Sequence, residues 1–486
     1  MTLAAHKLPR GTNPWPPSPP GPPSLLERLT LVHVGVLVVF AAWAFGGNTT
    51  WAQIALAWWG SLGALITLLA VQDRAARERG YLRPLRWLWP LGAFNVIVLA
   101  STLNVSFRAV ASGADWLYVE GHSLAGLPST ARPLLTLAAL WFFDAAYLSC
   151  FNLALVIRTR RALRALLLVV AANAFALAIF GTIQKLMGAK GLYFGLKSTR
   201  QLHFFASFIY DNHWGAFAVL MCGITIGLVA HYARHHSARD LLHSPAPVGL
   251  IVTGFLAAAI VLSSSRSGTA LVIVLLGVSF LHWIVSLVRT RRRDGRPVLL
   301  PVAGALLALA IAAWFAGELA RPEIARRLAD TRGQVAEMRA SGSFGVRTAL
   351  YRDTWNMARE KLAFGWGMGS YPTVFYRRNT QQFSHLDGLP MYFHDAHSDW
   401  LQSLSEVGLV GTLLLGLCAG VPLFHRWRTL GRSPLTGYLL AACGLIVLYA
   451  WVEFPFGNRA VVIAWWLCFF CAVHYGRLDG AADQPA

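Results

Sequence analysis

The sequence predicts an all-α integral membrane protein of about twelve transmembrane helices, with a long external loop that contains short helices. Three observations predict this fold. Of the 486 residues, 56% are hydrophobic and only 13% are charged, which is more apolar surface than a soluble domain of this length can bury. Apolar runs of roughly 17 to 25 residues, the length that crosses a bilayer, recur along the chain. Arginine clusters fall in alternate loops.

The apolar runs divide the chain into five segments. A Pro-rich tail (1–28) precedes nine spans within 29–316, and a long loop (317–396) separates these from three more spans within 397–475 and a final tail (476–486). The expected spans are 29–46, 51–71, 84–102, 133–157, 164–186, 213–231, 247–263, 267–288, 298–316, 399–423, 435–454 and 459–475.

The net charge of +20 is distributed in a pattern that predicts orientation. In a soluble protein this charge would suggest nucleic acid, but the arginines sit in short loops between spans, so no nucleic-acid partner is expected. Cytoplasmic loops carry an excess of Lys and Arg. Both tails therefore lie in the cytoplasm, and 317–396 lies outside as a periplasmic loop. The arginine clusters occupy 73–83, 158–164, 231–240, 289–296 and 425–432.

The stretch HDAHSDWLQSLSEVG (394–408) gathers titratable groups at the outer end of a span. At 100° per residue, His397 heads a stripe of Leu401, Leu404, Gly408 and Gly411, and Ser398 or Asp399 could cap the helix. A histidine so placed can accept a proton near neutral pH. A hydrogen-bonded interfacial histidine fits equally well, and a metal site built from His394, His397 and an aspartate is a third interpretation. Glu406 falls on the opposite side of the helix.

Two further stretches place cations on the outer side. SSSRSG (263–268) joins two spans almost without a loop, which holds Arg266 at the membrane boundary. An ionisable residue there suggests an anionic partner, although snorkelling to the interface would also explain it. The segment before the sixth span adds further polar groups on the same side. These are Lys197, Arg200, His203, Asn212 and His213.

The long loop contains two helical patterns. Residues 318–342 have apolar positions at helical spacing among charges, so they form either an amphipathic helix on the membrane or a solvated surface helix. A second pattern ends at Gly365, Gly367 and Gly369, and three alternate glycines permit a tight turn or a close backbone approach.

HSDWLQSLSEVGLVG resembles the His-Asn/Ser-x-x-Leu and Glu-x-Gly-x-x-Gly signature of the bacterial O-antigen ligase and O-antigen polymerase family. SSSRSG resembles the Ser-Arg-Gly element of that family, and the spacing from Arg347 to GWGMG resembles its external-loop pattern. The resemblance covers roughly residues 200 to 420. Ser398 stands where asparagine is common, and His394 is an imidazole that the pattern does not specify.

The resemblance implies a GT-C glycosyltransferase of the bacterial inner membrane. Such an enzyme moves a glycan from undecaprenyl pyrophosphate to an acceptor hydroxyl on the periplasmic side, without metal or other cofactor. It implies that His397 is the base and that Arg266 and Arg347 hold the pyrophosphate. Arg200 is expected to assist them, and His394, Asp399 and His213 to support the site. Inversion at the anomeric carbon and contact with membrane lipids are expected.

The acceptor remains open at this point. Lipid A core would make the chain a ligase, a second lipid-linked glycan would make it a polymerase, and a protein hydroxyl would make it an O-oligosaccharyltransferase. A transporter or flippase is the alternative from another class. It would predict an internal repeat and charges near mid-membrane, but the two halves show no repeat and the charges lie at span ends.

Overall fold

The computed structural model describes residues 24–478, apart from 79, 113–114, 199–202, 236–237, 242, 308–309, 311–317, 319–331, 333–345, 381–391 and 432. Arg200, both ends of the chain, the second part of the ninth expected span and most of 318–342 therefore lie outside the described residues.

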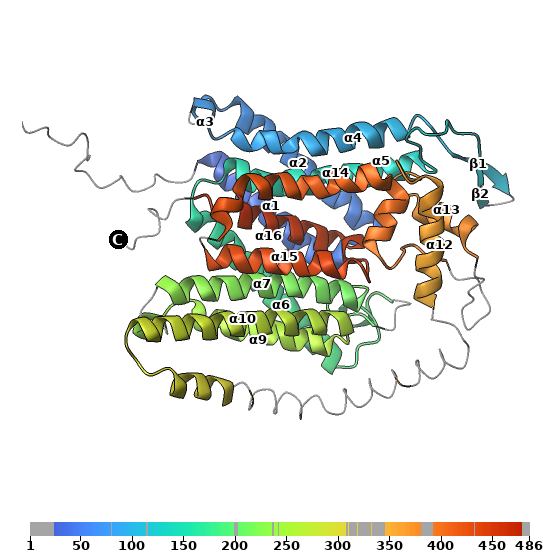
Figure 1. Ribbon diagram of the computed structural model, residues 1–486. Helices are drawn as coiled ribbons and strands as arrows, with labels where there is room; N and C mark the ends of the chain where they lie inside the picture. Colours follow the sequence, from blue (N-terminus) through green and yellow to red (C-terminus); the bar gives the residue numbers. More distant parts are fainter. Residues whose placement is uncertain are drawn as a thin grey trace, which may run out of the picture.

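The described chain is a bundle of roughly parallel helices with a small structure at one end (Figure 1). The α-helices are α1 (Leu25–Trp43), α2 (Thr50–Gln72), α3 (Arg74–Glu78), α4 (Trp89–Ser101), α5 (Pro133–Val156), α6 (Arg160–Leu186), α7 (Asp211–His235), α8 (Ala238–Leu241), α9 (Ala246–Leu262), α10 (Arg266–Arg293), α12 (Val346–Glu360), α13 (Tyr371–Arg378), α14 (Asp399–Leu430), α15 (Pro434–Tyr449) and α16 (Arg459–Tyr475). The short 3₁₀ helices are η1 (Phe45–Gly47), η2 (Arg83–Leu88), η3 (Tyr193–Gly195) and η4 (Pro455–Gly457), and the strands are β1 (Phe107–Ser112) and β2 (Asp115–Glu120).

Seven of the described helices are long and apolar enough to cross a membrane: α1, α2, α5, α6, α7, α10 and α14. Three shorter apolar helices, α9, α15 and α16, lie among them, and η2 continues into α4 over the third expected span. A multi-pass, mostly helical membrane protein is therefore confirmed, whereas the count of twelve spans is not. Outward-facing side chains such as Trp58 and Leu134 are apolar and exposed, as a lipid solvent requires.

The centre of the bundle is built from α7 and α16. Every residue of α16 after Arg459 is buried, and the helix packs against α1, α5, α7 and α15. Small residues allow α7 and α15 to approach closely, because a Cβ on Gly223 would stand 2.5 Å from the Cβ of Ala442. In contrast, α10 buries few of its side chains and faces mostly outward.

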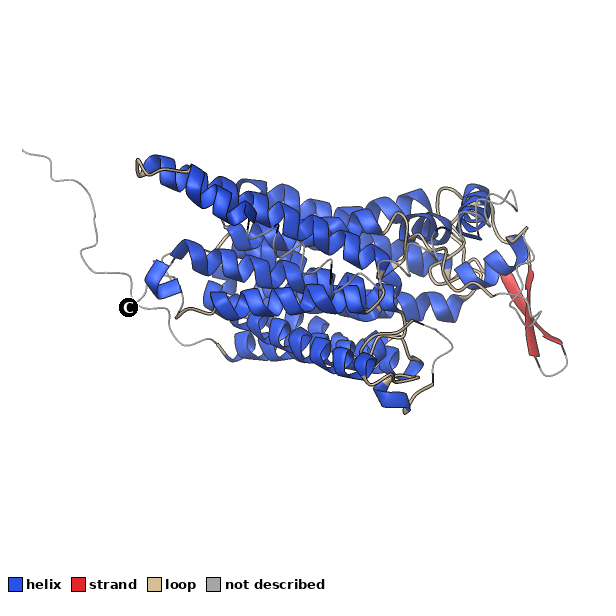
Figure 2. Cartoon of the chain, turned by 90° about the horizontal axis from the view of Figure 1, so that it is seen from below, coloured by secondary structure: helices blue, strands red, loops and turns tan. Residues whose placement is uncertain are grey.

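A cap covers one end of the bundle and includes a feature that the sequence did not predict. β1 and β2 pair as an antiparallel hairpin, which projects beyond the helix ends (Figure 2). Phe107 of β1 packs with residues of α12, α13 and their connecting loop in one buried cluster. The hairpin is a small addition to a structure that is otherwise mostly helical, as expected, and the expected short helices of the long loop are present as α12 and α13.

The opposite end of the bundle is rich in arginine. The C-terminal part of α14 packs against η2, where the Arg426 guanidinium lies 5.3 Å from the centroid of the Trp87 ring. The same end carries α3, while α12 and α13 lie at the other end (Figure 1). The basic loops and the cap thus lie on opposite sides of the bundle, which agrees with the arrangement that the charge pattern predicts.

Candidate active site

A buried carboxylate, Glu453, organises a polar cluster at the capped end of the bundle. It lies in the link between α15 and α16, and only 1% of its side chain is exposed. One carboxylate oxygen, Oε1, is 3.0 Å from His397 Nδ1, and the other, Oε2, accepts a hydrogen bond from Arg347 at 2.9 Å. A charge buried to this degree requires such partners.

His397 is held by contacts on several sides. Its ring stands edge-on to Phe454 with centroids 4.7 Å apart, and its backbone carbonyl accepts a hydrogen bond from the Tyr351 hydroxyl at 3.0 Å. Its φ of +52° is a conformation that a non-glycine residue adopts at an energetic cost, and such residues cluster at functional sites. The side chain remains 27% exposed, so part of the imidazole is accessible.

The expectation that His397 heads a helical stripe is wrong. α14 begins two residues later, at Asp399, and the left-handed backbone of His397 cannot continue that helix. Ser398 caps the helix as expected, since its hydroxyl accepts a hydrogen bond from Leu401 N. Gly408, with φ +66° and ψ −172°, then interrupts α14, which removes the regular spacing on which the stripe depended.

A second row of polar groups stands behind the carboxylate. Asn212, in the first turn of α7, donates to Glu453 Oε2 at 3.0 Å and to the Tyr210 hydroxyl at 2.7 Å. Its side-chain oxygen accepts a hydrogen bond from Ser265 at 2.8 Å. His213 lies on the same turn, buried, with Nε2 3.2 Å from the Phe454 carbonyl oxygen. His213 thus supports the link that carries Glu453.

The predicted cations differ in how the structure places them. Arg347, at the start of α12, binds Glu453 directly through one guanidinium nitrogen, yet 51% of its side chain is exposed. Arg266 is the exposed first residue of α10, beside Ser265, which both caps α10 and contacts Asn212. Arg266 and Arg347 therefore border the same cluster.

The remaining predicted residues lie next to the cluster in different roles. His394 is exposed, with its ring 4.8 Å from that of Tyr392. Asp399 accepts a hydrogen bond from Phe456 N at 2.8 Å and so braces the Glu453 link. Burial raises the pKa of the Asp395 carboxyl, and the charges of Arg459, His397 and His394 oppose that shift.

The geometry does not favour the metal interpretation. His394 and His397 precede α14, so they do not share a helix face, and His397 is directed to Glu453. Within the residues that the structure describes, no group of three or more His, Cys, Asp or Glu side chains is arranged to hold a metal ion.

Glu406 has a separate, structural position. Its carboxylate accepts hydrogen bonds from Gly369 N at 2.9 Å and Tyr371 N at 3.0 Å, which are free amides at the start of α13. Gly365, Gly367 and Gly369 all have positive φ, and a Cβ on Gly365 would lie 2.4 Å from the Glu406 backbone. The glycines thus make the predicted tight turn, in which Gly365 approaches the backbone of α14, Gly367 approaches Thr130 and Gly369 faces α5.

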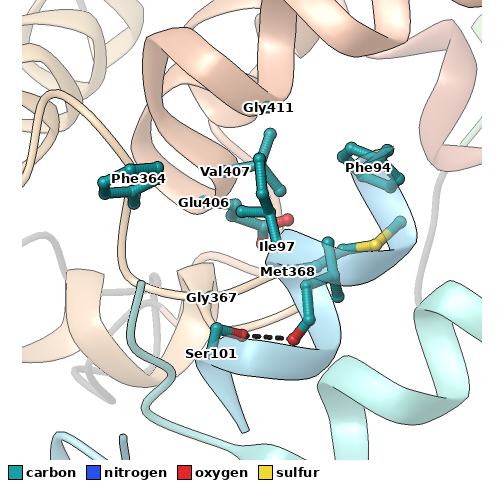
Figure 3. Close-up of a pocket in the computed structure, with 10 residues that line it drawn as sticks. Phe94, Ile97, Ser101, Phe364, Gly367, Met368, Glu406, Val407 and Gly411 are labelled. Carbon is teal, nitrogen blue, oxygen red and sulfur yellow. Dashed lines mark hydrogen bonds between the residues drawn. The ribbon is translucent and has the colours of Figure 1, made fainter. Parts of the chain in front are cut away.

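A narrow apolar pocket lies beside this turn, between α4, α14 and the loop that joins α12 to α13 (Figure 3). His397 and Glu453 do not line it, so it is separate from the polar cluster. Its lining consists of Phe94, Ile97, Val98, Ser101, Phe364, Gly367, Met368, Glu406, Val407 and Gly411.

The most important residue of the cluster, Glu453, was not expected from the sequence. The apolar run at 435–454 hides it inside an expected span, whereas α15 ends at Tyr449 and leaves Glu453 in the link. The motif WVEFPFGN supplied one signal, since an acidic residue followed by Pro and Gly at the end of a span indicates a turn. Tyr210 and Tyr351 carried no comparable signal.

A comparison with protein-family models matches residues 251–416 to the family described as O-antigen ligase. The match confirms the resemblance over the segment that contains Arg266, Arg347 and His397, and it supports a role in O-antigen or related polysaccharide assembly. A search of curated proteins found no match. Glu453 and Asn212 lie outside the matched segment, so their part in the cluster rests on the geometry of this chain.

Proposed function

We propose that this chain, whose residues 251–416 match the O-antigen ligase family, is a glycosyltransferase of the bacterial inner membrane. It moves a glycan from undecaprenyl pyrophosphate to an acceptor hydroxyl at the periplasmic face. The observation that carries this proposal is the contact between a partly exposed imidazole, His397, and a buried carboxylate, Glu453, which also binds Arg347.

His397 is the general base in this proposal. Glu453 Oε1 accepts a hydrogen bond from the N–H at Nδ1, which leaves Nε2 of the neutral imidazole free to accept the proton of the acceptor hydroxyl. The carboxylate also stabilises the imidazolium that forms, as a carboxylate does in other histidine-dependent transfer enzymes. The exposed part of the ring leaves room for the acceptor.

Arg347 and Arg266 stabilise the leaving group. As the acceptor oxygen bonds to the anomeric carbon, the bond from that carbon to the pyrophosphate oxygen breaks and negative charge develops on the pyrophosphate. Guanidinium groups match phosphate oxygens bidentately and neutralise that charge without a metal. Arg200 is proposed as a third contact. Attack opposite the leaving group inverts the anomeric centre, and undecaprenyl pyrophosphate departs.

The acceptor in this proposal is lipid A core or a second lipid-linked glycan. The family match favours polysaccharide assembly over transfer to a protein hydroxyl, which remains the alternative acceptor. Deletion of the gene separates these functions by electrophoresis of surface glycans. Loss of all long chains indicates a ligase, retention of single repeats on the core indicates a polymerase, and unchanged surface glycans with altered protein glycosylation indicate the alternative.

The direct test uses purified protein reconstituted with an undecaprenyl pyrophosphate-linked glycan and each acceptor. We expect acceptor-linked glycan from the native chain and none from His397→Ala, which should fold and insert normally because His397 precedes α14. EDTA should leave the rate unchanged. Movement of the donor across the bilayer without bond cleavage would instead establish a flippase and overturn the proposal.

A further inference from the structure

Three exposed aromatic rings form a continuous row at the capped end of the bundle. Tyr376, near the end of α13, lies with its ring centroid 6.1 Å from that of Tyr392, and Tyr392 contacts the His394 ring at 4.8 Å. Tyr376 is 59% exposed and Tyr392 is 49% exposed. Paired rings that remain this exposed present apolar faces and hydroxyl groups to solvent, a surface typical of recognition sites.

This row of rings leads to the candidate active site. His394 is three residues before His397, and Asp395 between them lies close enough that both imidazoles oppose the burial that raises its pKa. Ala396 is fully buried, so the backbone between the two histidines is anchored in the cap. The rings therefore extend from the surface of α13 to the residues that flank the proposed base.

A fixed cation adjoins the row. The Arg132 guanidinium lies 3.8 Å from the centroid of the Tyr118 ring and donates to the Thr373 hydroxyl at 3.3 Å. Thr373 lies on α13 three residues before Tyr376, so this hydrogen bond holds the guanidinium beside the helix that carries the row. A stacked guanidinium suits a carboxylate or phosphate group on a sugar.

We propose that Tyr376, Tyr392 and His394 bind the sugar rings of the acceptor glycan and that Arg132 binds an anionic substituent on them. The C–H faces of a pyranose pack against aromatic rings, while the tyrosine hydroxyls offer hydrogen bonds to sugar hydroxyls. The assignment to an acceptor rests on the proposed function. The choice of acceptor over donor follows from position. The row ends near His397, the proposed base for the acceptor hydroxyl, whereas Arg347, the proposed donor contact, binds the other oxygen of Glu453.

The test measures binding and needs no turnover. Purified His397→Ala protein in detergent is titrated with core oligosaccharide released from lipid A and, separately, with the saccharide of one repeat unit. One of the two saccharides should bind to this parent protein. Tyr376→Ala and Tyr392→Ala, each added to the parent, should weaken that binding roughly tenfold. The corresponding Phe changes keep the rings and should retain most of the affinity. Arg132→Gln should weaken binding only of a saccharide that carries acidic groups.

Trp116→Ala is the matched control, because this exposed aromatic residue lies on β2 at the same end of the molecule. Equal affinity in the alanine and parent proteins, or failure of the parent protein to bind either saccharide, would overturn the proposal that the row of rings binds the acceptor glycan. The outcome is separable from the proposed function. If the rings are needed for binding but the protein transfers no glycan, only the proposed function is wrong. If the protein transfers glycan and binding does not depend on the rings, only the saccharide-binding role of the rings is wrong.

Discussion

Glu453 and Glu406 are two buried carboxylates near the capped ends of the C-terminal helices, yet their partners differ in kind. Glu453 binds side chains: His397 and Arg347, which carry or can acquire positive charge, and the amide of Asn212. Glu406 binds backbone amides at the start of α13. The first arrangement leaves an imidazole and a guanidinium partly exposed beside the carboxylate. In the second, the carboxylate oxygens are bonded to the backbone of the fold.

The difference shows that burial of an acidic residue does not by itself mark a site. A carboxylate that accepts from backbone amides fixes a turn, because these donors belong to the chain's own architecture. A carboxylate that orients a solvent-accessible base has a chemical consequence beyond folding. Substitution of Glu453 is therefore expected to lower activity, whereas substitution of Glu406 is expected to lower stability.

The largest effect is expected at Glu453. Glu453→Gln should lower the rate of glycan transfer roughly a thousandfold, because the amide can neither fix the imidazole with Nε2 unprotonated nor stabilise the imidazolium. Rates are measured with the reconstituted system, and the melting temperature is recorded in detergent. A variant that keeps more than about a tenth of the native rate would show that Glu453 does not orient the base, and its melting temperature would then show whether Glu453 supports the fold.

The leaving-group arginines should have the next largest effect. Arg347→Ala and Arg266→Ala should each lower turnover roughly a hundredfold, equivalent to about 3 kcal/mol in the barrier. Lysine at either position should recover only part of the rate, because it keeps the charge and loses the bidentate geometry. Arg359→Ala, an exposed change on the same helix as Arg347, should have no effect. Unchanged turnover in Arg266→Ala would mean that this residue only snorkels.

Glu406 should affect stability more than chemistry. Glu406→Ala leaves the Gly369 and Tyr371 amides unpaired and should cost about 2 kcal/mol of unfolding free energy, seen as a lower melting temperature in detergent. Glu360→Ala is the control, because the exposed Glu360–Arg378 ion pair should contribute less than about 1 kcal/mol. If Glu406→Ala melts normally and loses activity, Glu406 belongs to the chemistry and the contrast with Glu453 fails.

Two cysteine substitutions at exposed positions should have the smallest effect on the protein. They test whether the end of the bundle that holds both carboxylates lies on the periplasmic side. Cysteine in place of exposed His122, in the loop before α5, should react with an impermeant maleimide added to spheroplasts, while Arg296→Cys after α10 should not. The six native cysteines are buried and should give little background. Neither change should alter activity. Labelling of Arg296→Cys alone would place the cluster on the cytoplasmic side and remove the proposed function.

The sequence predicted much of the frame and only part of the site. Apolar length identified the long spans, and the serine before α14 and the three glycines of GWGMG have the local roles expected of them. These features depend on neighbouring residues alone. The contact between His397 and Glu453 joins residues 56 positions apart and depends on how α14 packs against the α15–α16 link. Hydropathy also extended the eleventh span past Tyr449 and so hid the carboxylate.

The break at Gly408 has a mechanical consequence for an enzyme in a membrane. Spanning helices adjust their tilt when bilayer thickness changes. Both sides of the break are tied to the cap, since Gly367 N donates to the Glu406 carbonyl before it, and Leu409 N donates to the Leu362 carbonyl after it. Because these bonds hold α14 on both sides of Gly408, a change of tilt with the lipid is confined to the part of the helix after Val410. We therefore expect the outer end of α14, which begins two residues after the base, to keep its position on the cap when the thickness of the bilayer changes.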